Sequence, residues 1–163
     1  ALMASEALLE LSPSVGAYRR AAAVATVCGD DKRALRITHR GALVLSGGSS
    51  AHALALSHAF SLMRLGMQQE ALRTYMRVGS EGSSEERCNA LFSGALIAAS
   101  GGQDVAARWF VDRLEYEDPI MSERWKLAIA RTRARREGLG STRKILHALG
   151  ETFEVLLQIG GSC

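Results

Sequence analysis

Stretches of mixed apolar and polar residues fill the chain, and glycines interrupt them at regular intervals. Glycine adopts the left-handed backbone conformation that ends many helices, so these breaks predict helix ends. No stretch rich in Thr, Val and Ile alternates as a half-buried strand would. We therefore predict an all-α chain built from antiparallel helical hairpins.

Four hairpins are predicted, after a short helix over Ala4–Leu11, which makes about eight or nine helices in total. The first helices of the hairpins are expected over Val15–Cys28, Ser49–Leu65, Ser84–Ser100 and Ser122–Glu137. The second helices are expected over Lys32–Leu45, Gln69–Val78, Asp104–Glu115 and Ser141–Ile159. Ser83 and Ser84, followed by Glu86, are typical of a helix start.

The spacing of the breaks indicates a repeat. Gly29, Gly66 and Gly101 lie 37 and 35 residues apart, and Gly138 follows 37 residues later. Small residues stand seven positions before the first three glycines and five positions after them: Ala22, Ala59 and Gly94, then Ala34, Ala71 and Ala106. Nine positions after the same glycines stand Thr38, Tyr75 and Phe110. Small side chains let two helices approach closely, and a ring fills the space beside the crossing.

The segment from Leu65 to Leu72, followed by Tyr75, resembles the turn and second helix of a tetratricopeptide repeat. Gly94, Gly101, Ala106 and Phe110 are similar to the same pattern, whereas Arg143 occupies the small site of the fourth hairpin. The resemblance implies an α-solenoid, a superhelix of stacked hairpins. We predict one domain over 1–163, with repeats over 14–48, 49–83 and 84–118 and a capping hairpin over 119–160. A bundle without repeats is the alternative.

The resemblance also implies a concave surface that the first helices form, and this surface would bind a partner. Its expected residues are Arg19, Arg20, Ala23, Leu56, Phe60, Met63, Arg64, Cys88, Leu91, Phe92 and Ala95. Aromatic rings, methionine and arginine contribute strongly to protein interfaces. The alternative is that Phe60, Met63 and Phe92 are core residues between hairpins.

Some tetratricopeptide proteins grip a C-terminal carboxylate with lysines, arginines and asparagines in this groove. The matching positions here carry Arg19 and then Ala23, Ser57, Cys88 and Phe92, so the resemblance does not extend to that clamp. The expected occupant is instead an amphipathic helix or an extended apolar segment of another protein.

The remaining candidate chemistry is sparse. His52 and His58 are six residues apart, so a helix points them in different directions, and neither His39 nor His147 completes a ligand set. We expect no metal, no cofactor and no enzymatic activity. Three cysteines, Cys28, Cys88 and Cys163, are an odd number without metal-ligand spacing, which favours a reducing, cytoplasmic location. No stretch has the length of a membrane span.

Basic residues gather between positions 124 and 144, although the net charge of the chain is only +3. The run contains Arg124, Lys126, Arg131, Arg133, Arg135, Arg136, Arg143 and Lys144. Such density could bind phosphates, but Trp125, Leu127, Ala128 and Ile129 keep an apolar face, and no aromatic platform interleaves the arginines. We expect a solvated helix face rather than a nucleic-acid site, and an acidic partner is the second interpretation.

These features predict a protein-binding adaptor or chaperone. In size and repeat number the chain resembles the chaperones that bacterial type III secretion systems use for their secreted subunits. A regulatory or structural module of a larger protein is the alternative from another functional class.

Overall fold

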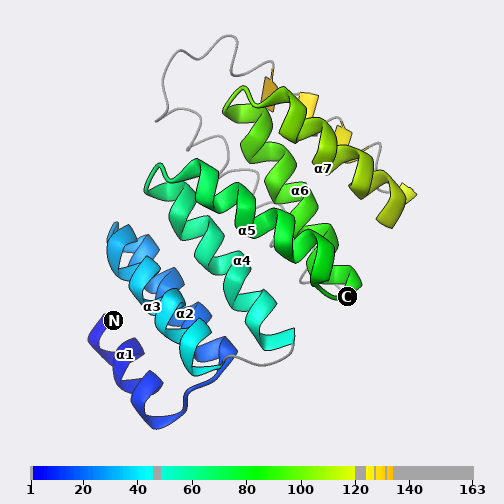
Figure 1. The fold of residues 1–163 in the computed structure, drawn as a ribbon. Coiled ribbons are helices and arrows are strands. Elements are labelled where there is room, and N and C mark those ends of the chain that lie inside the picture. The colour runs from blue at the N-terminus through cyan, green and yellow to red at the C-terminus, as the bar shows by residue number, and fades with distance from the viewer. Residues whose placement is uncertain (1, 46–48, 120–123, 127, 131, 134–163) are drawn as a thin grey trace. The chain divides into compact units, whose positions relative to one another are not determined.

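The computed structural model describes residues 2–45, 49–119, 124–126, 128–130 and 132–133 of the 163-residue chain. Helices dominate these residues and none of them forms a strand, so the all-α prediction is confirmed there (Figure 1). The helices are α1 (Leu2–Leu11), α2 (Val15–Val27), α3 (Asp31–Val44), α4 (Ser49–Arg64), α5 (Gln68–Glu81), α6 (Ser84–Ser100) and α7 (Asp104–Glu117). The predicted capping hairpin over 119–160 and Gly138 fall almost entirely outside the described residues.

The chain divides into two compact units, Ala1–Gly94 and Ala95–Cys163, and the boundary falls within α6. In the first unit α2 packs against α3 and α4 packs against α5. Helix α4 also contacts both α3 and α2, so the two hairpins lie side by side, drawn from blue to green in Figure 1. Helix α1 packs on α2. One domain with a superhelical arrangement over the whole chain stays a prediction.

Each hairpin reverses direction at a glycine with a positive backbone φ. At the end of α2, Gly29 has a φ of 78°. Its N–H donates to the carbonyl of Thr26 and the N–H of Asp30 donates to the carbonyl of Ala25, both at 2.9 Å. This pair of bonds is the Schellman motif, which satisfies carbonyls that the helix end leaves without partners. The Asp30 side chain then accepts from the N–H of Arg33 at 3.0 Å and so starts α3.

The same pair of bonds ends α4. Gly66 has a φ of 79°, and its N–H donates to the carbonyl of Met63 at 2.9 Å. The N–H of Met67 donates to the carbonyl of Leu62, also at 2.9 Å. Gln68, the residue after Met67, begins α5. Three residues therefore separate α4 from α5, as three residues separate α2 from α3.

The third turn corrects the sequence prediction by one residue. Gly102, not Gly101, has the positive φ of 76°, and the N–H of Gln103 donates to the carbonyl of Ala98 at 2.9 Å. Either glycine suits the left-handed conformation, but this hydrogen bond requires it at the second. The three left-handed glycines are consequently 37 and 36 residues apart, more evenly spaced than predicted.

Counted from these three glycines, the same positions are buried in every hairpin. Seven positions before each glycine stand Ala22, Ala59 and Ala95, and five positions after it stand Ala34, Ala71 and Ala107. Tyr18, Ala55 and Leu91 stand eleven positions before, and Gly41, Val78 and Leu114 stand twelve positions after. The predicted sites Gly94 and Ala106 therefore each move by one residue. The ring expected nine positions after each glycine does not repeat. Tyr75 stands nine positions after Gly66, but the fully buried Phe110 stands eight positions after Gly102.

Helix α5 extends beyond its predicted end at Val78, because it accommodates Gly79 instead of ending there. A Cβ added at Gly79 would lie 2.8 Å from Cδ2 of Leu91 in α6. A closer approach occurs in the first hairpin, where a Cβ at Gly41 would lie 2.7 Å from Cγ of Tyr18. Both glycines are thus present because neighbouring side chains occupy the space of a Cβ.

We expect Gly66→Ala to lower the free energy of unfolding by about 1 kcal/mol. Left-handed backbone costs an L-residue roughly 1–2 kcal/mol, which the smaller entropy of the unfolded alanine chain partly offsets. Nothing lies within 4 Å of the added Cβ, so steric overlap does not contribute. Gly66→Asn should lose less, because asparagine tolerates this conformation. Urea denaturation measures both, and a Gly66→Ala variant as stable as the wild type would contradict the turn geometry.

Gly41→Ala should destabilise the protein by about 1–3 kcal/mol through overpacking, although the same change in an open helix position is stabilising. The overlap falls on the ring base of Tyr18, which is buried and cannot move aside. Gly79→Ala is the matched control, since its added Cβ meets the flexible end of Leu91. Thermal and urea unfolding should show a larger loss for Gly41→Ala than for Gly79→Ala, and the reverse order would contradict this packing.

Candidate functional site

Several of the expected partner-binding residues are exposed or half-buried in the first unit. Arg19 and Arg20 are exposed on α2, and Leu56 and Phe60 are half-buried on α4. Leu56 and Phe60 are four residues apart and therefore share one face of α4. Helices α2 and α4 contact each other, so these residues occupy neighbouring first helices. We call these four residues the first-helix surface.

Three other expected residues lie in the interior. Met63 is 9% exposed, Phe92 is 5% exposed and Leu91 is fully buried. Leu91 packs beneath Gly79 of α5, as the close approach of its Cδ2 to that glycine shows. The burial of Met63 and Phe92 agrees with the alternative interpretation of core residues, whereas Phe60 is half-buried. Of the other expected residues, Ala95 is buried, Cys88 is half-buried and Ala23 is exposed.

Arg64 is held by an ion pair between the two hairpins. Its Nε lies 2.6 Å from Oδ1 of Asp31, in the first turn of α3. The side chains are 34% and 19% exposed. A carboxylate in the first helical turn also interacts favourably with the helix dipole. This ion pair therefore connects the end of α4 to the start of α3.

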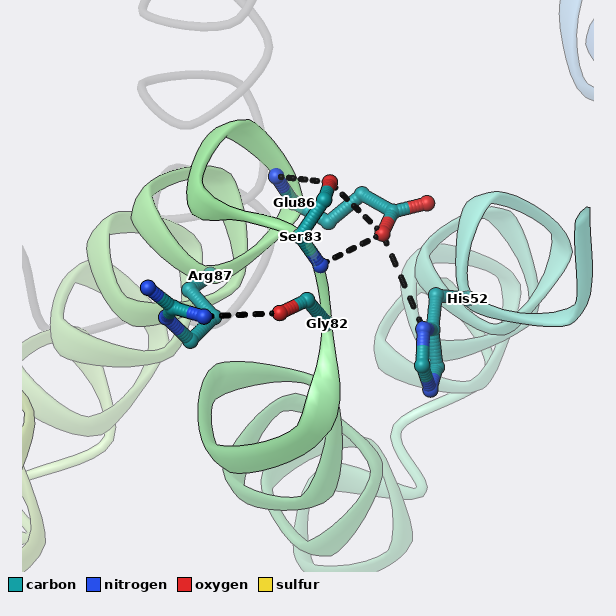
Figure 2. A network of polar contacts seen from close by, with 5 residues as sticks. All are labelled: His52, Gly82, Ser83, Glu86 and Arg87. Carbon is teal, nitrogen blue, oxygen red and sulfur yellow. Dashed lines mark hydrogen bonds and ion pairs between the residues drawn. The ribbon is translucent and has the colours of Figure 1, made fainter. Parts of the chain in front are cut away.

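A polar network joins α4 to the corner between α5 and α6 (Figure 2). The backbone N–H and the hydroxyl of Ser83 donate to Oε2 of Glu86 at 2.9 and 2.8 Å, and the N–H of Glu86 approaches the Ser83 hydroxyl at 3.5 Å. This reciprocal pairing is the capping box, and it starts α6 as the serines in the sequence predicted. Nδ1 of His52 lies 3.6 Å from the same Oε2, and Arg87 donates to the carbonyl of Gly82 at 2.9 Å.

The chemistry of this network is structural. Burial alone would raise the pKa of the Glu86 carboxyl, but the hydrogen bonds from Ser83 and the interaction with His52 outweigh it and lower the pKa. A carboxylate with a lowered pKa is a weak base. The Ser83 hydroxyl donates to this carboxylate and not to His52, so the arrangement lacks the hydroxyl-to-imidazole bond of an activated serine.

Two histidines that are distant in the sequence meet across the hairpins. The rings of His39 on α3 and His58 on α4 have centroids 5.9 Å apart. Nδ1 of His58 lies 3.1 Å from the hydroxyl of the fully buried Thr38, which also approaches the carbonyls of Ala34 and Leu35. Since a hydroxyl has one proton to donate, donation to either carbonyl leaves its oxygen to accept from His58. Sequence spacing alone could not reveal this contact between hairpins.

The remaining candidates from the sequence are described only in part. In the part of the chain that the structure describes, no group of three or more His, Cys, Asp and Glu side chains could hold a metal ion. Cys28 is exposed and Cys88 is half-buried. In the basic run, Lys126 pairs with Glu115 at 3.0 Å and Arg133 with Asp104 at 3.4 Å. His147, Cys163, Arg131 and the basic residues from Arg135 onward lie outside the described residues.

Comparison with known proteins gives no match: no protein-family model matches the sequence, and neither a curated protein nor a solved structure does. Among the described helices, none combines the length and the apolar composition that crossing a membrane requires.

We expect His58 to make the protein less stable at mildly acidic pH. Burial, and next the proximity of His39 and Arg77, lower the pKa of His58 from its ordinary value of 6.5. As the pH falls through about 6.5, His58 becomes protonated in the unfolded chain but stays neutral in the folded protein. The free energy of unfolding therefore decreases. His58→Asn retains a polar group near Nδ1 but removes this titration. Melting temperatures between about pH 7.5 and 5.5 should fall less steeply in the variant, and equal slopes would contradict this assignment.

Proposed function

We propose that this protein is a binding scaffold for another protein, which it holds on the first-helix surface. The observation that carries the proposal is the partial exposure of Leu56 and Phe60 on α4, next to a helix that presents Arg19 and Arg20. Apolar side chains with arginines nearby are typical of protein interfaces.

The small number of apolar residues on this surface favours a segment over a folded domain as its partner. Leu56 and Phe60 form one short apolar stripe, which an amphipathic helix covers with residues at three- and four-residue spacing. The two exposed arginines would meet acidic residues at the edge of that segment. Electrostatic attraction of this kind accelerates association more than it strengthens the final complex.

The repeated turns and buried positions support a tetratricopeptide-like scaffold, a class of architecture that uses its first helices for binding. A secretion chaperone is one form of this function, and a module of a longer adaptor is another. Both bind protein, so the first-helix surface has the same role in each. Nucleic-acid binding is less favoured, because Lys126 and Arg133 are engaged with carboxylates.

Co-purification from the native source, followed by mass spectrometry, tests the proposal. We expect Phe60→Glu to reduce recovery of a specific partner about tenfold or more, because it places a charge in the centre of the apolar stripe. Tyr116→Glu is the matched control, since Tyr116 on α7 is 87% exposed and lies outside the first-helix surface.

A second variant tests the same surface independently, in case Phe60→Glu does not fold. The double change Arg19→Glu and Arg20→Glu alters only exposed side chains and should slow association, with a smaller effect at high salt. Circular dichroism confirms that each variant is folded. If folded Phe60→Glu and the double variant both retain every partner of the wild type, the first-helix surface is not the binding site.

A further inference from the structure

Helix α4 carries two histidines whose surroundings differ in charge. His58 lies at the contact between the two hairpins of the first unit, where it meets α3. His52 precedes it by six residues and meets the start of α6. Six residues turn an α-helix through about 600°, so the two side chains leave α4 in different directions. The scaffold function proposed above uses neither of them.

The titratable and charged groups that act on His58 are basic. Among the helices that pack against α4, α3 contributes His39, whose ring centroid lies 5.9 Å from that of His58, and α5 contributes Arg77. Burial lowers the pKa of His58 most, and these two neighbours lower it further. A proton on His58 would therefore place a positive charge beside Arg77, in a half-buried contact.

The hydrogen bond to Thr38 does not offset this effect. With its own proton donated to a carbonyl of α3, the Thr38 hydroxyl accepts from Nδ1 of His58, so neutral His58 already carries a proton on Nδ1. A second proton would bind to Nε2 and leave this bond in place. Protonation therefore adds a charge next to basic neighbours, and it weakens the contact between α3 and α4.

His52 meets the opposite charge. Its Nδ1 lies 3.6 Å from Oε2 of Glu86, while Arg87 of the same network donates to the carbonyl of Gly82 (Figure 2). The side chains of His52 and Glu86 are 23% and 15% exposed, so solvent screens this contact less than one at the open surface. The pKa of the Glu86 carboxyl is lowered, which keeps it ionised in mild acid. A proton on His52 therefore converts the contact into an ion pair and strengthens it.

A third contact of α4 limits the movement. Arg64, six residues after His58, lies 2.6 Å from Asp31 of α3, and a guanidinium keeps its charge throughout this pH range. Acid consequently weakens the contact between α3 and α4 at His58, while the ion pair still connects the end of α4 to the start of α3. The expected change is a local loosening and not a separation of the two hairpins.

We propose that the two histidines of α4 form an acid-sensitive device, in which protonation of His58 loosens α4 from α3 while protonation of His52 tightens the contact of α4 with the start of α6. As the pH falls from about 7.5 to 5.5, the stabilising contacts of α4 shift from α3 toward α6. The first-helix surface spans both hairpins, so its two halves are joined through the contact that acid loosens. The device belongs to the fold and does not depend on partner binding at that surface.

Hydrogen–deuterium exchange of the full chain at pH 7.5 and 5.5, measured on peptides by mass spectrometry, tests the device. After correction for the pH dependence of chemical exchange, α3 should exchange about three- to tenfold faster at pH 5.5. The reason is that a loosened state, in which His58 has its ordinary pKa of 6.5, binds a proton that the closed state disfavours. The first turns of α6 should exchange about twofold or more slowly. Unchanged exchange in either helix, or faster exchange in both, would overturn the proposal.

Single variants separate the two histidines. His58→Asn should abolish the acid response of α3 and keep that of α6, whereas His52→Asn should do the reverse. Circular dichroism at pH 7.5 confirms that each variant is folded. If both folded variants respond to acid as the wild type does, the assignment is wrong.

A pair of arginine variants tests the contact at His58 even if His58→Asn does not fold. Arg77→Gln removes the cation beside His58 and should reduce the acid response of α3. Arg73→Gln changes another exposed arginine of α5 and is the matched control, which should respond as the wild type does. Equal responses of the two arginine variants would contradict the role of Arg77.

Discussion

The packing of the hairpins depends on how each chain reversal is closed. Two backbone hydrogen bonds at a left-handed glycine satisfy the last carbonyls of one helix, and the following residue starts the next helix. Because the reversal is so short, it determines which face of the second helix meets the first. That face carries a fully buried alanine in each hairpin, namely Ala34, Ala71 and Ala107. Small side chains at these points let the helix axes approach closely, and the larger apolar residues around them then become buried.

Polar contacts of α4 add specificity to this apolar packing in the first unit. Arg64 and His58 contact α3 through Asp31 and Thr38, and His52 contacts Glu86 at the start of α6. Partly exposed ion pairs contribute only about 0–1 kcal/mol each, so burial of apolar surface dominates the stability. The directional contacts instead favour one register of α4 against its neighbours, because a shift along the helix would break all three.

Sequence patterns predicted the helices well because glycine breaks and helix caps act locally. The choice between Gly101 and Gly102 was beyond such patterns, since both residues can adopt the required conformation. The partner-binding groove stays a prediction: Leu56 and Phe60 are half-buried on α4, but Leu91 is covered by α5. Periodicity indicates which residues share a helix face, but not which neighbouring helix covers that face. The His39–His58 contact was missed for the same reason, because it joins separate helices.

The short hairpin turns also affect how the length of this chain can vary in evolution. Between α2 and α3 only Cys28, Gly29 and Asp30 intervene, and each has a role in ending or starting a helix. One inserted residue would rotate the second helix by about 100° about its axis and turn Ala34 out of the interface. Insertions and deletions in homologous genes should therefore avoid these three turns.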